Sequence, residues 1–164
     1  MGYISDDTRK VTTHRLIEMK QRGEKISMLT SYDYTMAQIV DGAGVDVILV
    51  GDSASNVMAG NVTTLPITLD QMIYHGKSVV RGVKRAMVIV TCLSALIRQR
   101  TGGIASAIRI MKESHAERLK LEGGEEIIGT GEAYPQRRYS HHGTSRTDAP
   151  IHQQVWNIYG PCQG

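Results

Sequence analysis

The chain has 164 residues, a length typical of one domain, and its 41% hydrophobic and 21% charged residues are ordinary for a globular protein. A formal net charge of +3 gives no reason to expect a nucleic-acid or membrane partner. Its two cysteines, Cys92 and Cys162, are too few for a disulfide framework, which favours a cytoplasmic location. The N-terminal segment lacks the apolar stretch of a secretory signal, and no apolar run could span a bilayer.

Helical and extended patterns alternate along the first part of the chain. A Thr-Thr pair at 12–13 precedes an amphipathic helix that ends at Gly23, and 26–30 is a short strand. A helix over 33–40 follows. The β-branched run at 46–50 is typical of a strand buried on both faces of a parallel sheet.

The same alternation continues beyond a glycine-containing loop at 51–66. Thr68 caps the next predicted helix, and 86–90 is the third strand. A helix over 104–112 and a strand over 118–121 complete the pattern. Strands that alternate with helices in this way predict an α/β fold with a parallel sheet. Periodicity alone does not distinguish two arrangements of such a sheet, an open doubly wound sheet and a (β/α)8 barrel. Four strands are half of the number that the barrel needs.

Polar side chains follow three of these predicted strands, where parallel α/β folds gather their functional residues. Asp52 and Ser53 come after the second strand, Thr91 after the third, and Lys120 and Glu122 at the fourth. The two carboxylates are hard oxygen ligands that suit Mg²⁺, and the lysine could hold an anionic substrate. Taken singly, each of these signals also fits a structural turn or a solvated strand edge.

Five segments, in the same order and at similar spacing, resemble the ketopantoate hydroxymethyltransferase family. They are LTSYDY at 29–34, AGVDVILVGDS at 43–53, TTLPIT at 63–68, MIYH at 72–75 and KLEGG at 120–124. The resemblance runs from about residue 11 to 90 and again from about 104 to 129. Motifs of this length are specific, so chance is a poor explanation.

The resemblance implies an incomplete (β/α)8 TIM barrel over 1–128, roughly the first four β/α units, from a family of homo-oligomers that are typically decamers. The implied reaction transfers a hydroxymethyl group from 5,10-methylenetetrahydrofolate to 3-methyl-2-oxobutanoate and gives 2-dehydropantoate, for pantothenate biosynthesis. The implied cofactor is Mg²⁺, with the folate as co-substrate. The implied partners are these small molecules, with neither nucleic acid nor membrane.

The resemblance also implies roles for four residues at matching motif positions. Asp52 would bind the metal and the substrate, and Glu122 would complete the metal shell. Ser53 and Lys120 would bind the oxo acid. The roles of Tyr32 and Asp33, at the end of the first strand, stay open.

The resemblance breaks after the third strand, where the family has an aspartate in a segment like DLPFGTYQ and this chain reads TCLSALIRQ at 91–99. Degenerate codons for this stretch, displaced by one base, spell the family segment. The tail at 129–164 contains neither Leu nor Met, and codons for 142–151, similarly displaced, spell MGHLGLTPQ. We therefore predict a frameshift, or an error in the determined sequence, after about residue 90 and again after about residue 130, with a non-native, irregular tail.

This interpretation has functional consequences. The third-strand aspartate is replaced by Thr91, and the family's catalytic glutamate base has no counterpart, so no catalytic residue is assigned. We expect the chain to be inactive as written and to fold poorly by itself, because half a barrel leaves an open sheet edge and an uncovered apolar face.

Two alternatives belong to other classes. One is another Mg²⁺-enolate barrel enzyme, such as the phosphoenolpyruvate mutase-like lyases, although the motifs at 32–34 and 63–66 favour the transferase. The other is a non-catalytic binding protein whose basic tail, with Arg137, Arg138 and Arg146, contacts a partner.

Overall fold

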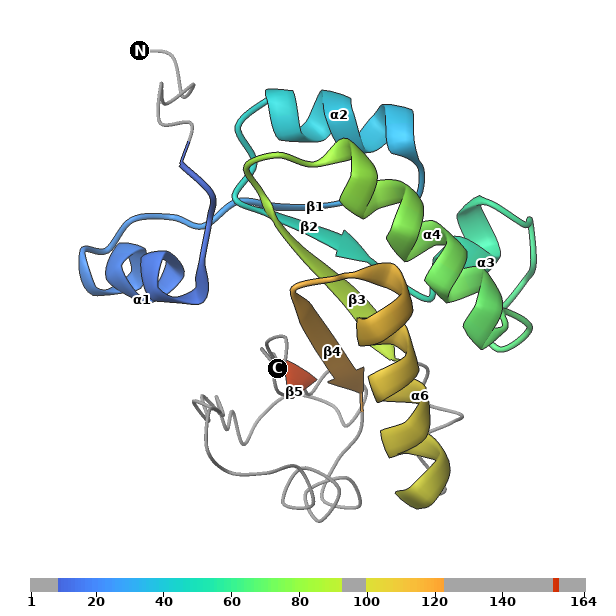
Figure 1. The fold of residues 1–164 in the computed structure, drawn as a ribbon. Coiled ribbons are helices and arrows are strands. Elements are labelled where there is room, and N and C mark those ends of the chain that lie inside the picture. Colours follow the sequence, from blue (N-terminus) through green and yellow to red (C-terminus); the bar gives the residue numbers. More distant parts are fainter. Residues whose placement is uncertain (1–8, 93–99, 123–154, 157–164) are drawn as a thin grey trace.

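The computed structural model describes residues 9–92, 100–122 and 155–156 of the chain (Figure 1). The elements are α1 (Thr13–Gln21), β1 (Met28–Thr30), α2 (Tyr34–Gly42), β2 (Val47–Val50), α3 (Ala54–Val57), α4 (Leu69–Gly82), β3 (Met87–Cys92), α6 (Arg100–Ser114), β4 (Arg118–Glu122) and β5 (Val155–Trp156). Strands β1 to β4 pair in parallel in that order, and β5 pairs antiparallel with β4. The predicted α/β fold with four parallel strands is confirmed.

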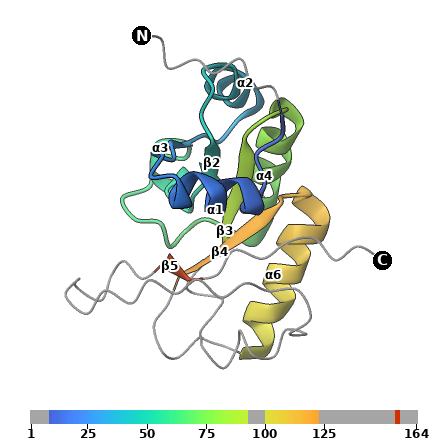
Figure 2. The ribbon, with the colours of Figure 1, turned by 90° about the vertical axis from the view of Figure 1, so that its left-hand side faces the viewer.

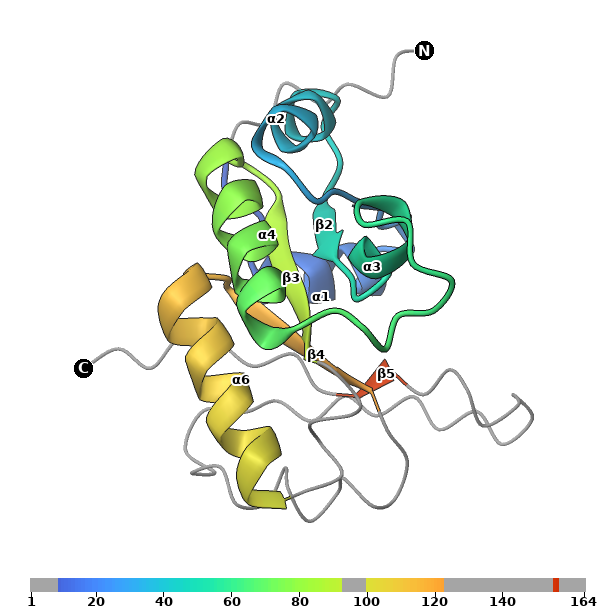
Figure 3. The same cartoon turned by 90° about the vertical axis from the view of Figure 1, so that its right-hand side faces the viewer.

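The arrangement of strands and helices distinguishes the doubly wound sheet from the barrel, which periodicity could not do. The four parallel strands lie in chain order, and α2, α4 and α6 all lie on one face of the sheet (Figure 3). A doubly wound sheet reverses its strand order and carries helices on both faces. A β/α barrel keeps the chain order and places its crossover helices outside. The described sheet is therefore of the barrel type.

Two apolar clusters cover the two faces of the sheet. The larger joins alternate strand residues to the crossover helices, and among its members are Val40, Ile48, Val50, Met72, Val79, Val88, Val90, Ile110 and Leu119. The smaller contains Val11, Val47, Met87 and Ile89, with Leu16 and Leu49 packed against them. Helix α1 lies on this second face (Figure 2). Strand β3 is buried at every position, because it lies between β2 and β4 and is covered on both sides.

The helix starts follow from capping side chains that the sequence predicts. Thr12 accepts a hydrogen bond from the backbone N–H of Arg15, at the start of α1. Thr68 forms a capping box with Gln71, whose side-chain oxygen lies 2.7 Å from the backbone nitrogen of Thr68. These bonds satisfy N–H groups that the first turn of a helix leaves without partners.

Helix α4 packs closely against its neighbours because two of its positions have no side chain. A Cβ atom added at Gly76 would lie 2.9 Å from the Cβ of Ser114 on α6 and 3.3 Å from a methyl group of Val90 on β3. A Cβ atom at Gly82 would lie 2.7 Å from the carbonyl oxygen of Tyr34. Glycine at these positions therefore sets how near α4 lies to α2, α6 and the sheet.

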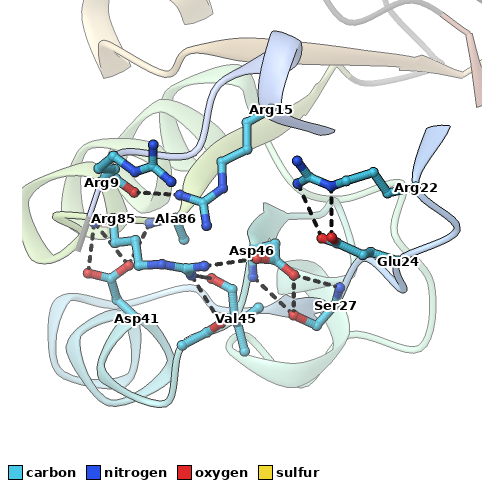
Figure 4. A network of polar contacts seen from close by, with 11 residues as sticks. Arg9, Arg15, Arg22, Glu24, Ser27, Asp41, Val45, Asp46, Arg85 and Ala86 are labelled. Atoms are coloured by element: carbon cyan, nitrogen blue, oxygen red, sulfur yellow. Dashed lines mark hydrogen bonds and ion pairs between the residues drawn. The ribbon is translucent and has the colours of Figure 1, made fainter. Parts of the chain in front are cut away.

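A carboxylate ties α2 to the amino end of β3. Asp41 accepts hydrogen bonds from the backbone N–H groups of Lys84, Arg85 and Ala86, the shortest being 2.7 Å from Ala86 (Figure 4). Burial alone would raise the pKa of Asp41, but these three bonds, with the nearby charge of Lys10, lower it below its usual value of 3.8. The ionised carboxylate thus holds the turn that leads into β3.

A buried ion pair lies beside this turn. Arg85 contacts Asp46 at 3.0 Å, and the side chains are only 11% and 9% exposed (Figure 4). Asp46 also accepts from the backbone N–H and the hydroxyl of Ser27, at 3.0 and 2.8 Å. Burial would raise the pKa of Asp46, but the bonds from Ser27 and the contact with Arg85 lower it overall. The network joins the starts of β1, β2 and β3, at the amino edge of the sheet.

One edge of the described sheet is open. Strand β1 pairs only with β2, and Met28 and Leu29 are 55% and 53% exposed. Met36 and Ile39 are exposed on α2. They occupy the flank of α2 opposite Ala37 and Gln38, which lie close to Gly82 of α4. This edge has the features expected of half a barrel.

The structure differs from the sequence prediction in one segment. The predicted loop at 51–66 contains α3, because the N–H groups that follow β2 bond locally, as Ala54 does to the carbonyl oxygen of Gly51. In the tail, Val155–Trp156 pairs with the edge of β4; the rest of the tail lies outside the described residues, so its irregular structure stays a prediction. In the described part of the chain, no helix is long and apolar enough to cross a membrane.

We expect Gly76→Ala to lower the free energy of unfolding by about 1–3 kcal/mol, because the added methyl group must push α6 or Val90 away. Urea titration followed by circular dichroism measures the change. Gly42→Ala is the matched control, since a Cβ atom there meets nothing within 4 Å and alanine favours the helix. Equal effects of the two substitutions would contradict the packing argument.

We also expect the chain to lose stability as the pH falls below about 4, the usual pKa of an unfolded aspartate. The folded-state pKa values of Asp41 and Asp46 are lowered, so the stability that their ionised forms contribute is present above this pH and is lost as they protonate. Asp41→Asn should destabilise the chain at neutral pH and flatten the acid limb of its stability curve. Asp70→Asn, at a side chain that is 74% exposed, is the control and should leave that limb in place.

Candidate active site

The carboxyl ends of β2, β3 and β4 lie at one edge of the sheet. Val50 is level with Val90 on β3, which is level with Leu119 on β4. Asp52 comes two residues after Val50, and Glu122 comes three residues after Leu119. The backbone at both predicted metal ligands therefore lies at the same edge, with β3 between them.

Asp52 lies in a tight turn between β2 and α3. The N–H group of Ser55 bonds to the carbonyl oxygen of Asp52 at 2.9 Å, so helical bonding starts directly after the strand. Gly51, Ala54 and Ser55 are buried, whereas Asp52 is partly exposed. Among the described residues, its carboxylate has no hydrogen-bond or ion-pair partner. It is available to a ligand at this edge.

Ser53 is held by a residue whose role the sequence left open. The hydroxyl of Tyr32, which follows β1, lies 2.8 Å from the Oγ of Ser53. The Nδ1 atom of His75, on α4, lies 2.8 Å from the carbonyl oxygen of Tyr32. Both Tyr32 and His75 belong to segments of the family resemblance, but no sequence pattern indicates that they meet, because 43 residues separate them.

Thr91 and Lys120 are neighbours on the second face of the sheet, the face that α1 also covers. They are paired in register on β3 and β4. Thr91 is 1% exposed, and its hydroxyl has no hydrogen-bond partner among the described residues. An unpartnered buried hydroxyl costs free energy, so Thr91 is a polar group that the described fold itself does not use.

Some of the predicted site residues have side chains outside the part of the chain that the structure describes. The backbone of Glu122 ends β4, but its side chain lies outside the described residues, as do Arg137, Arg138 and Arg146 of the tail. Within the described residues, no group of three His, Cys, Asp or Glu side chains lies close enough together to hold a metal ion. The roles of Asp52, Ser53, Lys120 and Glu122 as ligands therefore stay predictions.

Fold and site together are those of a β/α-barrel enzyme, with its polar groups at the carboxyl edge of a parallel sheet. The family model of ketopantoate hydroxymethyltransferase matches residues 10–137. The chain is 85% identical over 130 residues to the 3-methyl-2-oxobutanoate hydroxymethyltransferase of Bacteroides fragilis, which covers 79% of this chain and 48% of that protein. It is 83% identical over 130 residues to the enzyme of that name from Bacteroides thetaiotaomicron (79% of this chain, 48% of that protein), and 71% identical over 126 residues to that of Porphyromonas gingivalis (76% and 46%).

The chain belongs to the ketopantoate hydroxymethyltransferase family, a family of transferases. It spans about half the length of the curated relatives it matches. The parallel β/α sheet is thus part of a TIM barrel, as the resemblance predicts. Family membership favours the transferase over the phosphoenolpyruvate mutase-like class.

Cys92, the last residue of β3, is a poor candidate for a nucleophile. Its side chain is fully buried among the apolar residues of the larger cluster. This burial raises the pKa of the thiol to about 12. Because the thiolate is the reactive form, the environment suppresses the reactivity of Cys92.

We expect iodoacetamide at about pH 8 to leave Cys92 unmodified in the native chain, because only about one thiol in ten thousand is ionised when the pKa is near 12. Peptide mass spectrometry of the treated chain measures the modification at this residue. The same treatment in denaturant is the control and should modify Cys92 fully. Rapid modification without denaturant would contradict the buried position.

Proposed function

We propose that this chain carries the oxo-acid side of the active site of a hydroxymethyltransferase. The reaction of the whole enzyme transfers the hydroxymethyl group of 5,10-methylenetetrahydrofolate to 3-methyl-2-oxobutanoate and gives 2-dehydropantoate. The observation that carries the proposal is the common edge: Asp52 follows β2, and Thr91 and Lys120 are paired in register within the neighbouring strands β3 and β4, in a chain of this family. A cytoplasmic location and a homo-oligomer, the decamer that the family resemblance implies, belong to the same proposal.

The residue types at this edge suit a magnesium ion. Asp52 has a partly exposed carboxylate without a described partner, and Glu122 follows at the end of β4. Mg²⁺ is commonly held by one or two carboxylates, and substrate and water complete its shell. When bound, the ion supplies Lewis-acid polarisation of the 2-oxo group, which makes the C3 proton of the acid removable.

Other groups at this edge suit the rest of the oxo acid. The ammonium group of Lys120 can balance the negative charge of the substrate carboxylate. It can also balance the negative charge that develops on the substrate when the C3 proton leaves. The hydroxyl of Ser53 can donate a hydrogen bond to the substrate.

Position 91 decides how well this chain can bind the ion. The family resemblance places an aspartate there, and this chain has Thr91. A neutral hydroxyl beside Lys120 offers an oxygen without the charge that a divalent ion needs. We infer that the chain binds Mg²⁺ weakly and does not catalyse the transfer as it stands.

We expect Thr91→Asp to strengthen Mg²⁺ binding by about tenfold or more, because it adds a carboxylate between Asp52 and the end of β4. Isothermal titration with Mg²⁺ measures the change in affinity. Thr91→Asn is the matched control, since it has nearly the same shape as aspartate but no charge. Adding Asp52→Asn should remove the gain, and a gain that survives this change would place the ion elsewhere.

The proposed chemistry also has a direct test. We expect no Mg²⁺-dependent exchange of the C3 proton of 3-methyl-2-oxobutanoate in deuterated buffer with the chain as it stands. Proton NMR measures the exchange, and a frame-corrected chain of the length of its relatives is the positive control. Exchange above the uncatalysed rate by the present chain would contradict its inactivity.

A further inference from the structure

The strongest feature that the proposed function does not use is a relay behind Ser53, formed by Tyr32 and His75. Tyr32 follows β1, Ser53 follows β2, and His75 lies on α4. The Tyr32 hydroxyl lies 2.8 Å from the Oγ of Ser53, and the His75 Nδ1 lies 2.8 Å from the carbonyl oxygen of Tyr32. The relay therefore joins two strand ends at the carboxyl edge to a helix on the outer face.

The position of the Ser53 hydroxyl is restricted from a second side. A Cβ atom added at Gly51 would lie 2.9 Å from the Oγ of Ser53. The absence of a side chain at Gly51 thus leaves the space that the hydroxyl occupies. With the Tyr32 hydroxyl on one side and the backbone of Gly51 on the other, the serine side chain is held in one position.

His75 fixes the backbone at the end of β1 through a hydrogen bond of known direction. A carbonyl oxygen only accepts, so the Nδ1 atom of His75 carries the proton and donates it to the carbonyl oxygen of Tyr32. The imidazole also makes edge contacts with the rings of Tyr32 and Tyr74, with ring centroids 6.4 and 5.6 Å away. These contacts restrict the histidine ring and, through it, the backbone that carries Tyr32.

The direction of the bond between Tyr32 and Ser53 follows from the charge of the proposed substrate. Either hydroxyl could donate in the chain alone. An oxo-acid carboxylate only accepts, so a serine that binds it must use its one proton for that bond. Tyr32 must then donate to Ser53, and each bond in such a chain polarises and strengthens the next.

We propose that Tyr32 is a positioning residue: its hydroxyl, anchored through its own backbone by His75, orients the proton of Ser53 toward the carboxylate of the oxo acid. This inference rests on the proposed function, because the anion supplies the direction of the relay. Tyr32 acts through Ser53 and does not itself contact the substrate.

The test is a double-mutant cycle on binding of 3-methyl-2-oxobutanoate in the presence of Mg²⁺, measured by NMR titration of the full chain. Tyr32→Phe should weaken binding about five- to tenfold, the loss expected when the one hydrogen bond that orients the Ser53 hydroxyl is removed. Ser53→Ala should weaken it by a similar factor. The double variant should bind as Ser53→Ala does, because Tyr32 has no effect without the serine hydroxyl.

Tyr34→Phe is the matched control. The Tyr34 hydroxyl accepts a hydrogen bond only from Gln38 on the exposed surface of α2, among the described residues, so its loss should not change binding. His75→Ala should weaken binding as Tyr32→Phe does, and His75→Asn should restore part of it, because the asparagine amide can donate from nearly the same place as Nδ1. Thermal unfolding of each variant separates lost binding from lost folding.

The outcomes distinguish this inference from the proposed function. If the unsubstituted chain shows no saturable binding of the oxo acid, the proposed function fails and the inference fails with it. If the chain binds the acid but Tyr32→Phe binds equally well, only the inference fails. Additive effects of Tyr32→Phe and Ser53→Ala would likewise overturn it, since they would show that the tyrosine acts independently of the serine.

Discussion

The parallel pairing of β2, β3 and β4 is the constraint on which the rest of the structure depends. Parallel strands bring their carboxyl ends to one edge, so residues that lie some seventy positions apart become neighbours without any contact of their own. The register of β3 sets this alignment, since Val90 is paired with both Val50 and Leu119. Behind the sheet, the absence of a side chain at Gly76 lets α4 pack closely against Val90, the residue at the centre of this register.

The two ends of the sheet use their charged residues in opposite ways. At the amino edge, Asp41, Asp46 and Arg85 are bonded to backbone groups or to one another. At the carboxyl edge, Asp52 and the hydroxyl of Thr91 have no partner among the described residues. Unpaired buried polar groups cost free energy, and the well-bonded amino edge helps to offset that cost. This division is typical of barrels, in which the amino face serves stability and the carboxyl face serves function.

Local signals in the sequence predicted most elements, and long-range contacts explain what they missed. Thr12 and Thr68 stand directly before the helices that they cap, and the β-branched run forms β2 itself. These elements were therefore predictable from the sequence. The ends of the predicted strands indicated the candidate ligands, and the family resemblance assigned their roles. Neither source indicated the relay from His75 through Tyr32 to Ser53, because it depends on how α4 packs over the end of β1. The sequence did not predict the short α3, because its backbone hydrogen bonds begin at the turn where β2 ends.

Position 91 shows why the location of the site is easier to predict than its activity. The residues that precede Thr91 on the same face of β3, Met87 and Ile89, are apolar and packed in a cluster. Continuing that pattern would put an apolar residue at 91, so the fold itself gives no reason for a polar group there. A polar residue at position 91 makes sense only because Lys120 lies beside it and Asp52 lies at the same edge of the sheet. A carboxylate there would be balanced by the lysine and a divalent ion, whereas a hydroxyl keeps the desolvation cost and adds no charge. Under the proposed function, the scaffold keeps the strand arrangement of the site, and the side chain at position 91 sets its affinity for the metal.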